Sequence, residues 1–397
     1  MSFENPENII RSWNLQGSFS NSQVTEDKLV PRRWKRIRTV HVKTWREEQL
    51  NSTIDWGVKA FSYFMPESLR VVASMFLEIN LPALDGSQAQ RYKAYPGMYA
   101  IKELRFLSAG TEAYKVNPEL YLRDYMESLT DEECKHFADV YLGGQNATSD
   151  ARTILVPILL PNSTYLSRKV RGSRGNGIFP AYTGSNRIEM QITLCDAAEI
   201  STNATPASIQ NQCKMMVHQV EMNPNDVLRY SDVRGAYSVI NRRFTEVTAG
   251  WQSASANTVT KLTQVQPLGT VTELFVIAVP AGTEEARREI VSLVPTTRFS
   301  ITADSITQKS LNSAKKCEIE LYSNGYCPNT YFPCASRIVF AAFGSDSHKY
   351  SGGYNMSLAS QIQIDLEFAQ NVDFKVYAVQ LQRTTINSLG LLQSTLD

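Results

Sequence analysis

The amino-acid sequence predicts an all-β protein with two consecutive eight-stranded sandwiches of jelly-roll type and a short helical insertion in the first. Apolar segments with period-two alternation recur at roughly ten-residue spacing along most of the 397-residue chain. They form two sets of about eight strands, separated by a polar, turn-rich zone. We therefore expect an N-terminal arm at 1–34, a first jelly roll at 35–222, a joint at 223–236 and a second jelly roll at 237–397.

The overall composition is that of a packed globular protein. The chain is 43% hydrophobic and 20% charged, which gives enough apolar side chains for sizeable cores. Its formal net charge of +1 provides no overall field to hold it on nucleic acid or an acidic membrane. This composition argues against a protein whose body coats nucleic acid, because such proteins are far more basic.

The N-terminus and the cysteines indicate the compartment. Met1–Pro6 lacks a charged region followed by an apolar stretch, so we expect no signal peptide. No run approaches the roughly 18 apolar residues that span a bilayer, so we expect a soluble chain made in the cytosol. In that compartment the 6 sparse cysteines are expected to be reduced thiols.

Strand signals in the first half begin directly after the arm. Val40 and Val42 alternate with polar residues, and the same pattern recurs at 75–81, 101–107, 188–194 and 215–221. The apolar run at 153–160 is continuous, which is typical of a strand buried on both faces. Pro157 has no backbone N–H to donate, so we expect a bulge or a sheet edge there.

Two helices are expected inside the first strand set. Asn117 suits an N-cap position, and Pro118 suits the first helical position after it. Thr130 and Glu133 have the spacing of a capping box, which opens a second helix that Gly143 stops. We expect this pair as an insertion in a strand-rich domain.

The second half of the sequence also predicts a series of short strands. A short helix is expected at Thr283–Arg288. Alternating or apolar segments predict strands at 239–247, 274–279, 299–301, 319–321, 338–343, 362–368 and 374–381.

The last part of the chain carries the most specific pattern. Phe343–Gly344 is followed by Ser351–Gly353, Asn355–Ser357, the alternating strand 362–368 and the segment Tyr377–Gly390. In this order the segments resemble the C-terminal jelly roll of double jelly-roll major capsid proteins. That lineage includes adenoviruses, tectiviruses and nucleocytoplasmic large DNA viruses, with their polinton-like and adomavirus-like relatives.

Earlier segments resemble strands of the same family in the expected order. The resemblance covers roughly 35–390, but the family's aromatic residues are missing near Leu159 and the compact length leaves little room for surface towers. The matching segments are Met75–Leu84, Leu104–Glu112, Ile154–Pro161 and Ile188–Leu194.

The resemblance implies a viral major capsid protein that forms homotrimeric, pseudo-hexagonal capsomers of an icosahedral double-stranded DNA virus shell. Three copies of a double sandwich give six sandwiches, an outline that tiles a plane. The implied location is the virion. The implied partners are further copies of the chain, neighbouring capsomers, penton proteins and minor cement proteins. An internal membrane or packaged DNA is also an implied partner, reached through the N-terminal arm.

One dense basic cluster stands at the end of the arm. The favoured interpretation is a solvated strand entry that forms intersubunit salt bridges, because five charges beside Trp34 and Ile37 are modest. The alternative is an inner-face contact with packaged DNA or an acidic membrane. The cluster consists of Arg32, Arg33, Lys35, Arg36 and Arg38.

No constellation in the sequence points to a catalytic, metal or cofactor site. The four histidines are scattered, and His218 on an apolar strand is expected to be a packed core residue. Cys327 and Cys334 lack a second pair at metal-ligand spacing, and no nucleophile-elbow motif is present. We expect no enzyme activity, no cofactor and no small-molecule substrate.

Two other functions stay open at this stage. A carbohydrate-binding or glycan-cleaving β-sandwich protein would need a groove of exposed aromatic residues and, for cleavage, two facing carboxylates. The 18 tyrosines and 5 tryptophans allow this function without indicating it. Another viral structural protein, of penton type or with a single jelly roll, is disfavoured by the repeated strand set.

Overall fold

The computed structural model describes residues 42–50, 53–57, 60–65, 71–85, 90–127, 129–144, 146–161, 179–180, 188–203, 205–221, 237–263, 269–282, 294–323, 339–343, 353–387, 389 and 391–396. The arm at 1–34, the joint at 223–236 and the helix expected at Thr283–Arg288 lie outside these residues.

The chain divides into two compact units. The first comprises Met1–Leu122, Ala138–Asn241 and Gln382–Thr395, and the second comprises Arg123–Phe137, Arg242–Leu381 and Leu396–Asp397. The segment Gln382–Thr395 thus belongs to the first unit, where the backbone N–H of Leu392 donates to Ser108 Oγ at 3.1 Å. The jelly-roll boundaries expected from the sequence stay a prediction.

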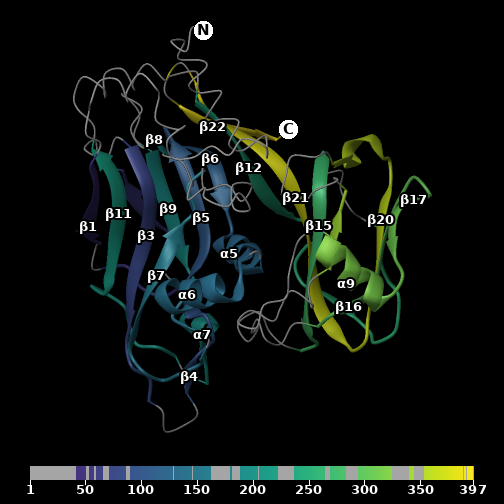
Figure 1. The fold of residues 1–397 in the computed structure, drawn as a ribbon, viewed down its shortest axis with the longest axis horizontal. Coiled ribbons are helices and arrows are strands. Elements are labelled where there is room, and N and C mark those ends of the chain that lie inside the picture. Colours follow the sequence, from purple (N-terminus) through teal and green to yellow (C-terminus); the bar gives the residue numbers. More distant parts are fainter. Residues whose placement is uncertain are drawn as a thin grey trace. The chain divides into compact units, whose positions relative to one another are not determined.

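The first unit contains two antiparallel sheets (Figure 1). The order in one sheet is β1 (Val42–Gln49), β11 (Cys213–Glu221), β3 (Val71–Leu81) and β7 (Arg152–Ile158), with β8 (Phe179–Pro180) also on β3. The order in the other is β2 (Phe61–Phe64), β9 (Ile188–Leu194), β5 (Ile101–Ser108) and β6 (Thr111–Val116). The connections hold a ribbon of β4 (Arg91–Tyr92) and β10 (Ser201–Thr202), and the short helices α4 (Pro96–Tyr99) and α7 (Ala197–Ile200).

The strands of the second half form two further sheets (Figure 1). The order in one is β12 (Tyr237–Glu246), β21 (Val372–Ile386), β15 (Thr270–Pro280) and β18 (Val339–Ala342). The order in the other is β14 (Thr260–Leu262), β20 (Ile362–Phe368), β16 (Thr296–Ala303) and β17 (Ile306–Leu311). Short strands extend the first of these sheets: β13 (Gln252–Ala254) and β22 (Leu392–Leu396) on β21, and β19 (Tyr354–Asn355) on β15, followed by the turn η6 (Met356–Leu358).

The two strand sets have the same topology. Each set has eight main strands, which in chain order are β1, β2, β3, β5, β6, β7, β9 and β11 in the first set and β12, β14, β15, β16, β17, β18, β20 and β21 in the second. In both sets, the neighbours in one sheet are the first, eighth, third and sixth of these strands, and the neighbours in the other sheet are the second, seventh, fourth and fifth. This is the strand order of a jelly roll, and its repetition confirms the predicted all-β class with two consecutive eight-stranded jelly rolls. In both sets, helices stand between the fifth and sixth strands: α5 (Pro118–Glu127) and α6 (Asp131–Tyr141) in the first, and α9 (Ala314–Ser323) in the second.

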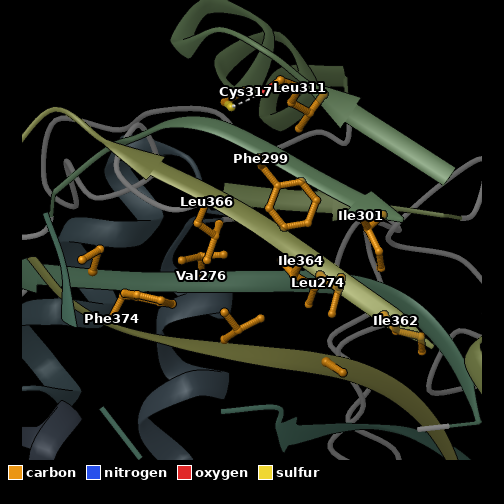
Figure 2. Close-up of a cluster of buried hydrophobic side chains, with 14 of the residues drawn as sticks. Leu274, Val276, Phe299, Ile301, Leu311, Cys317, Ile362, Ile364, Leu366 and Phe374 are labelled. Carbon is orange, nitrogen blue, oxygen red and sulfur yellow. Dashed lines mark hydrogen bonds between the residues drawn. The ribbon is translucent and has the colours of Figure 1, made fainter. Parts of the chain in front are cut away.

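The second set encloses a core between its two sheets (Figure 2). Leu274 and Val276 of β15 and Phe374 of β21 face Phe299 of β16 and Ile364 of β20, and all five are 0% exposed. Alternate residues supply this core, because successive side chains of a strand point to opposite faces. Burying each such side chain contributes about 1.5–3 kcal/mol.

The predicted helical insertion is confirmed at its caps. Asn117 Oδ1 accepts a hydrogen bond from the backbone N–H of Glu119 at 3.1 Å, at the start of α5. Glu133 Oε2 accepts from the backbone N–H of Thr130 at 3.2 Å, and Thr130 Oγ1 accepts from that of Glu133 at 3.4 Å. The capping box therefore opens α6, and Gly143 at φ 83° ends it.

The prediction of a strand at 319–321 is wrong, because these residues lie in the helix α9. Ser313 Oγ accepts a hydrogen bond from the backbone N–H of Lys316 at 3.3 Å and caps the helix. Cys317 is buried while Ile319 is 56% exposed. A three-residue alternation is too short to distinguish a strand from one turn of helix.

The expectation of burial on both faces at 153–160 is also wrong. In β7 the side chains alternate between buried and half-buried, with Val156 buried and Leu155 and Pro157 half-buried. Pro157 does lie on a strand at the end of the described sheet order, as its missing N–H predicts. The side chains on the outer face of β7, such as Leu155 and Pro157, are therefore not part of the core.

Replacing Gly143 with alanine should destabilise the first unit by about 2–4 kcal/mol. A Cβ there would lie 2.8 Å from Ile154 Cγ2 and 2.9 Å from Pro96 Cγ, in addition to the left-handed backbone. Gly110 at φ 78° has nothing within 4 Å of its Cβ position, so Gly110→Ala is the matched control. Its expected cost is about 1–2 kcal/mol. Urea unfolding measures both, and equal losses would contradict the role given to packing around Gly143.

Candidate functional site

The described residues contain no cluster of histidine, cysteine or acidic residues that could hold a metal ion. No helix among them is long and apolar enough to cross a membrane. The four described cysteines are buried and form no disulfide. Burial raises the pKa of Cys213 to about 12 and that of Cys317 to about 11, so these two thiols stay protonated at neutral pH.

The residues predicted as basic contacts cannot be placed. Arg32, Arg33, Lys35, Arg36 and Arg38 all lie outside the described residues.

One outer face of the first unit is polar. On the sheet β2-β9-β5-β6, Glu103 accepts from Arg105 and from Lys115, whose Nζ lies 2.5 Å from Glu103 Oε2. Burial alone would raise the pKa of Glu103, but the hydrogen bonds from Lys115 and Arg105 outweigh it and leave that pKa lower than usual. This face is covered by its own ion pairs and is suited to water.

The opposite outer face, on the sheet β1-β11-β3-β7, carries aromatic and apolar side chains beside charged ones. Trp45 of β1 is 53% exposed and stacks on His218 of β11, with ring centroids 4.5 Å apart and planes at 10°. Trp45 also lies 5.9 Å from the ring of Phe76, which stacks on Tyr141 at 5.3 Å. We call this surface the aromatic face and define it by Trp45, Phe76, Leu155, Pro157, Met216 and His218.

The aromatic face follows from the register of the strands. Trp45 pairs with His218, and in the next row Met216 pairs with Phe76, which pairs with Pro157. These residues alternate with core residues, so they all point to the outer side of the sheet. At the edge of the face, Lys214 Nζ lies 3.8 Å from Glu47 and 3.7 Å from Glu78.

Sequence reasoning missed the aromatic face. His218 is not the core residue that was expected, because it is half-buried on the outer side and its core neighbours are Met215 and Val217. The signal was present in the strand 75–81, where Phe76 occupies a position that alternates with the core. An aromatic residue at an outward position of a half-buried strand marks a surface for contact.

The corresponding outer face of the second set is buried. On β15 the outward residues Glu273, Phe275 and Val279 are 0% exposed. Phe275 packs against Phe244 with ring centroids 6.2 Å apart, and Arg242 forms an ion pair with Glu273 beyond the intervening strand β21. This outer face is thus fully buried on β15, whereas on β3, the equivalent strand of the first set, Phe76 is half-buried.

Strand order and sheet faces define the class of fold, a double jelly roll, and comparison with solved structures agrees. The chain is 11% identical to PBCV-1 VP54, in the crystal structure fitted into a reconstruction of the virophage Sputnik, with a TM-score of 0.63 over 90% of this chain and 97% of that one. It is 10% identical to the Faustovirus major capsid protein, with a TM-score of 0.61 over 88% and 91%. It is also 10% identical to the mavirus major capsid protein, with a TM-score of 0.57 over 89% and 90%.

The likeness lies in the fold and not in the sequence. No family model matches the chain, and no curated protein matches it. The predicted resemblance to double jelly-roll major capsid proteins is confirmed for the architecture, which extends over nearly the whole chain.

Replacing one partner of the buried Arg242–Glu273 ion pair tests how much this pair contributes to the stability of the protein. Glu273→Leu should cost about 3–5 kcal/mol of unfolding free energy, because Arg242 would keep an uncompensated charge at 1% side-chain exposure. The double variant Arg242→Met, Glu273→Leu should lose much less. Denaturant unfolding of the two variants beside the wild type measures this, and additive losses would contradict a coupled pair.

Proposed function

We propose that this chain is the major capsid protein of an icosahedral double-stranded DNA virus, and that it forms homotrimeric, pseudo-hexagonal capsomers. The observation that carries the proposal is the repeated eight-strand order, which is shared over nearly the whole chain with the Faustovirus and mavirus major capsid proteins. We place the protein in the virion on the same ground.

The architecture suits a structural shell protein better than an enzyme. Two sandwiches in one chain give a subunit with two similar rigid blocks, and three copies related by a rotation close into a ring of six. Permanent interfaces are large and apolar, and the aromatic face supplies such a surface. We therefore assign a structural role without a substrate or cofactor.

The same proposal implies specific binding partners within a virus shell. Neighbouring capsomers, penton proteins and minor cement proteins would contact the trimer. The basic residues Arg32 to Arg38 would contact packaged DNA, an internal membrane or a neighbouring subunit. The division into an arm at 1–34 and jelly rolls at 35–222 and 237–397 belongs to the proposal as well.

The native mass tests the proposal. Light scattering on the purified chain should give a stable particle of about three times 44.6 kDa, and negative-stain images of the same peak should show a hexagonal outline. Dilution should not dissociate the particle, since obligate interfaces keep their partners.

A well-behaved monomer at all concentrations would contradict the capsomer function. Binding of that monomer to a glycan array, abolished by Trp45→Ala, would then support the carbohydrate-binding alternative. A stable dimer without higher forms would also contradict the trimer.

A further inference from the structure

The aromatic face is exposed in the first unit although its counterpart in the second set is buried. On the first strands, Trp45 of β1 is 53% exposed whereas Arg242 of β12 is 2% exposed, and on the third strands Phe76 of β3 is half-buried whereas Phe275 of β15 is 0% exposed. Phe76 already packs on Tyr141 of the same chain, but the exposed ring of Trp45 leaves this part of the surface open to a partner.

The second compact unit contains helical residues from both strand sets. Besides its own strands, that unit includes Arg123–Phe137. In the sequence this segment belongs to the connection between the fifth and sixth strands of the first set, β6 and β7. The equivalent connection of the second set, between β17 and β18, contains α9.

The helix α9 has an exposed face that suits this role. Lys315, Lys316 and Ile319 are all exposed, and the two lysines precede Ile319 by four and three residues, so both lie beside it on one side of the helix. Cys317 is buried and anchors the other side, where its Sγ contacts the Leu311 carbonyl oxygen at 3.9 Å (Figure 2). Ile319 at 56% exposure is an apolar side chain without core packing.

The charges of the two surfaces are complementary. On β1, Glu47 is two residues from Trp45 on the same side of the strand, and its side chain is 58% exposed. At the edge of the aromatic face, Glu47 and Glu78 flank Lys214, so these three residues carry one net negative charge that the exposed lysines of α9 can meet. Opposite charges at a rim orient two partners, while the rings and the isoleucine provide the buried area.

We propose that α9 of a second copy of this chain docks on the aromatic face, with Ile319 against Trp45 and the lysines Lys315 and Lys316 toward Glu47. The inference rests on the proposed self-association. It makes the contact heterologous, since two different surfaces of each copy meet. Heterologous contacts close into rings when the rotation allows, and a trimer is such a ring.

Two charge-introducing variants test the docking, each with a matched control. Trp45→Glu alters the aromatic face, and Phe64→Glu, at a position 55% exposed on β2 of the other sheet, is its control. Ile319→Glu alters α9, and Ile306→Glu, at a position 66% exposed on β17, is its control. All four positions are exposed, so the fold should persist, which circular dichroism checks.

Native mass spectrometry of the variants alone and mixed gives the result. Trp45→Glu and Ile319→Glu should each weaken association by at least about 30-fold and leave monomers, whereas the controls stay trimeric. An equimolar mixture of the two should form one-to-one heterodimers. The intact aromatic face of the Ile319→Glu copy still meets the intact α9 of the Trp45→Glu copy, but the ring cannot close.

Each other outcome contradicts a different statement. A trimeric wild type that stays trimeric in both folded variants overturns the docking and leaves the capsomer function standing. Dissociation by Trp45→Glu with no heterodimer in the mixture overturns α9 as the partner surface. A monomeric wild type overturns the capsomer function together with this contact.

Discussion

In each strand set the last strand lies between the first and the third, and the remaining architecture depends on that placement. β11 pairs with β1 and β3, and β21 pairs with β12 and β15. The first pairing joins Val42 to Glu221, so one sheet closes only when the whole set has been synthesised. Such distant pairing costs loop-closure entropy before it gives stability. Once formed, it fixes the register and therefore which side chains face inward and which face outward.

The outer faces then diverge although the strand order is the same. Ion pairs around Glu103 make one face suited to water, and the stacked rings of Trp45 and His218 make another suited to contact. In the second set the equivalent face is buried around Phe275. The proposed self-assembly uses this difference, because each added copy could cover the aromatic face of another.

Much of this fold could be predicted from the sequence, because alternation and helix caps are local signals. The capping residues Asn117, Thr130 and Glu133 correctly predicted the two helices, and the alternation at 188–194 correctly predicted β9. The strand expected at Ile319 failed, since three residues do not separate a period of two from a helical turn. The contact surface was missed because it needs the register: Trp45 and Phe76 are far apart in the chain and meet only across β11. His218 was misplaced for the same reason.

Electron cryomicroscopy of the purified wild-type assembly, reconstructed without imposed symmetry, tests the central claim most directly. The account predicts a three-fold particle with six sandwiches, in which α9 of each copy lies on the sheet β1-β11-β3-β7 of its neighbour. A particle whose copies meet through the polar face around Glu103, or whose α9 faces solvent beside an uncovered Trp45, would contradict it.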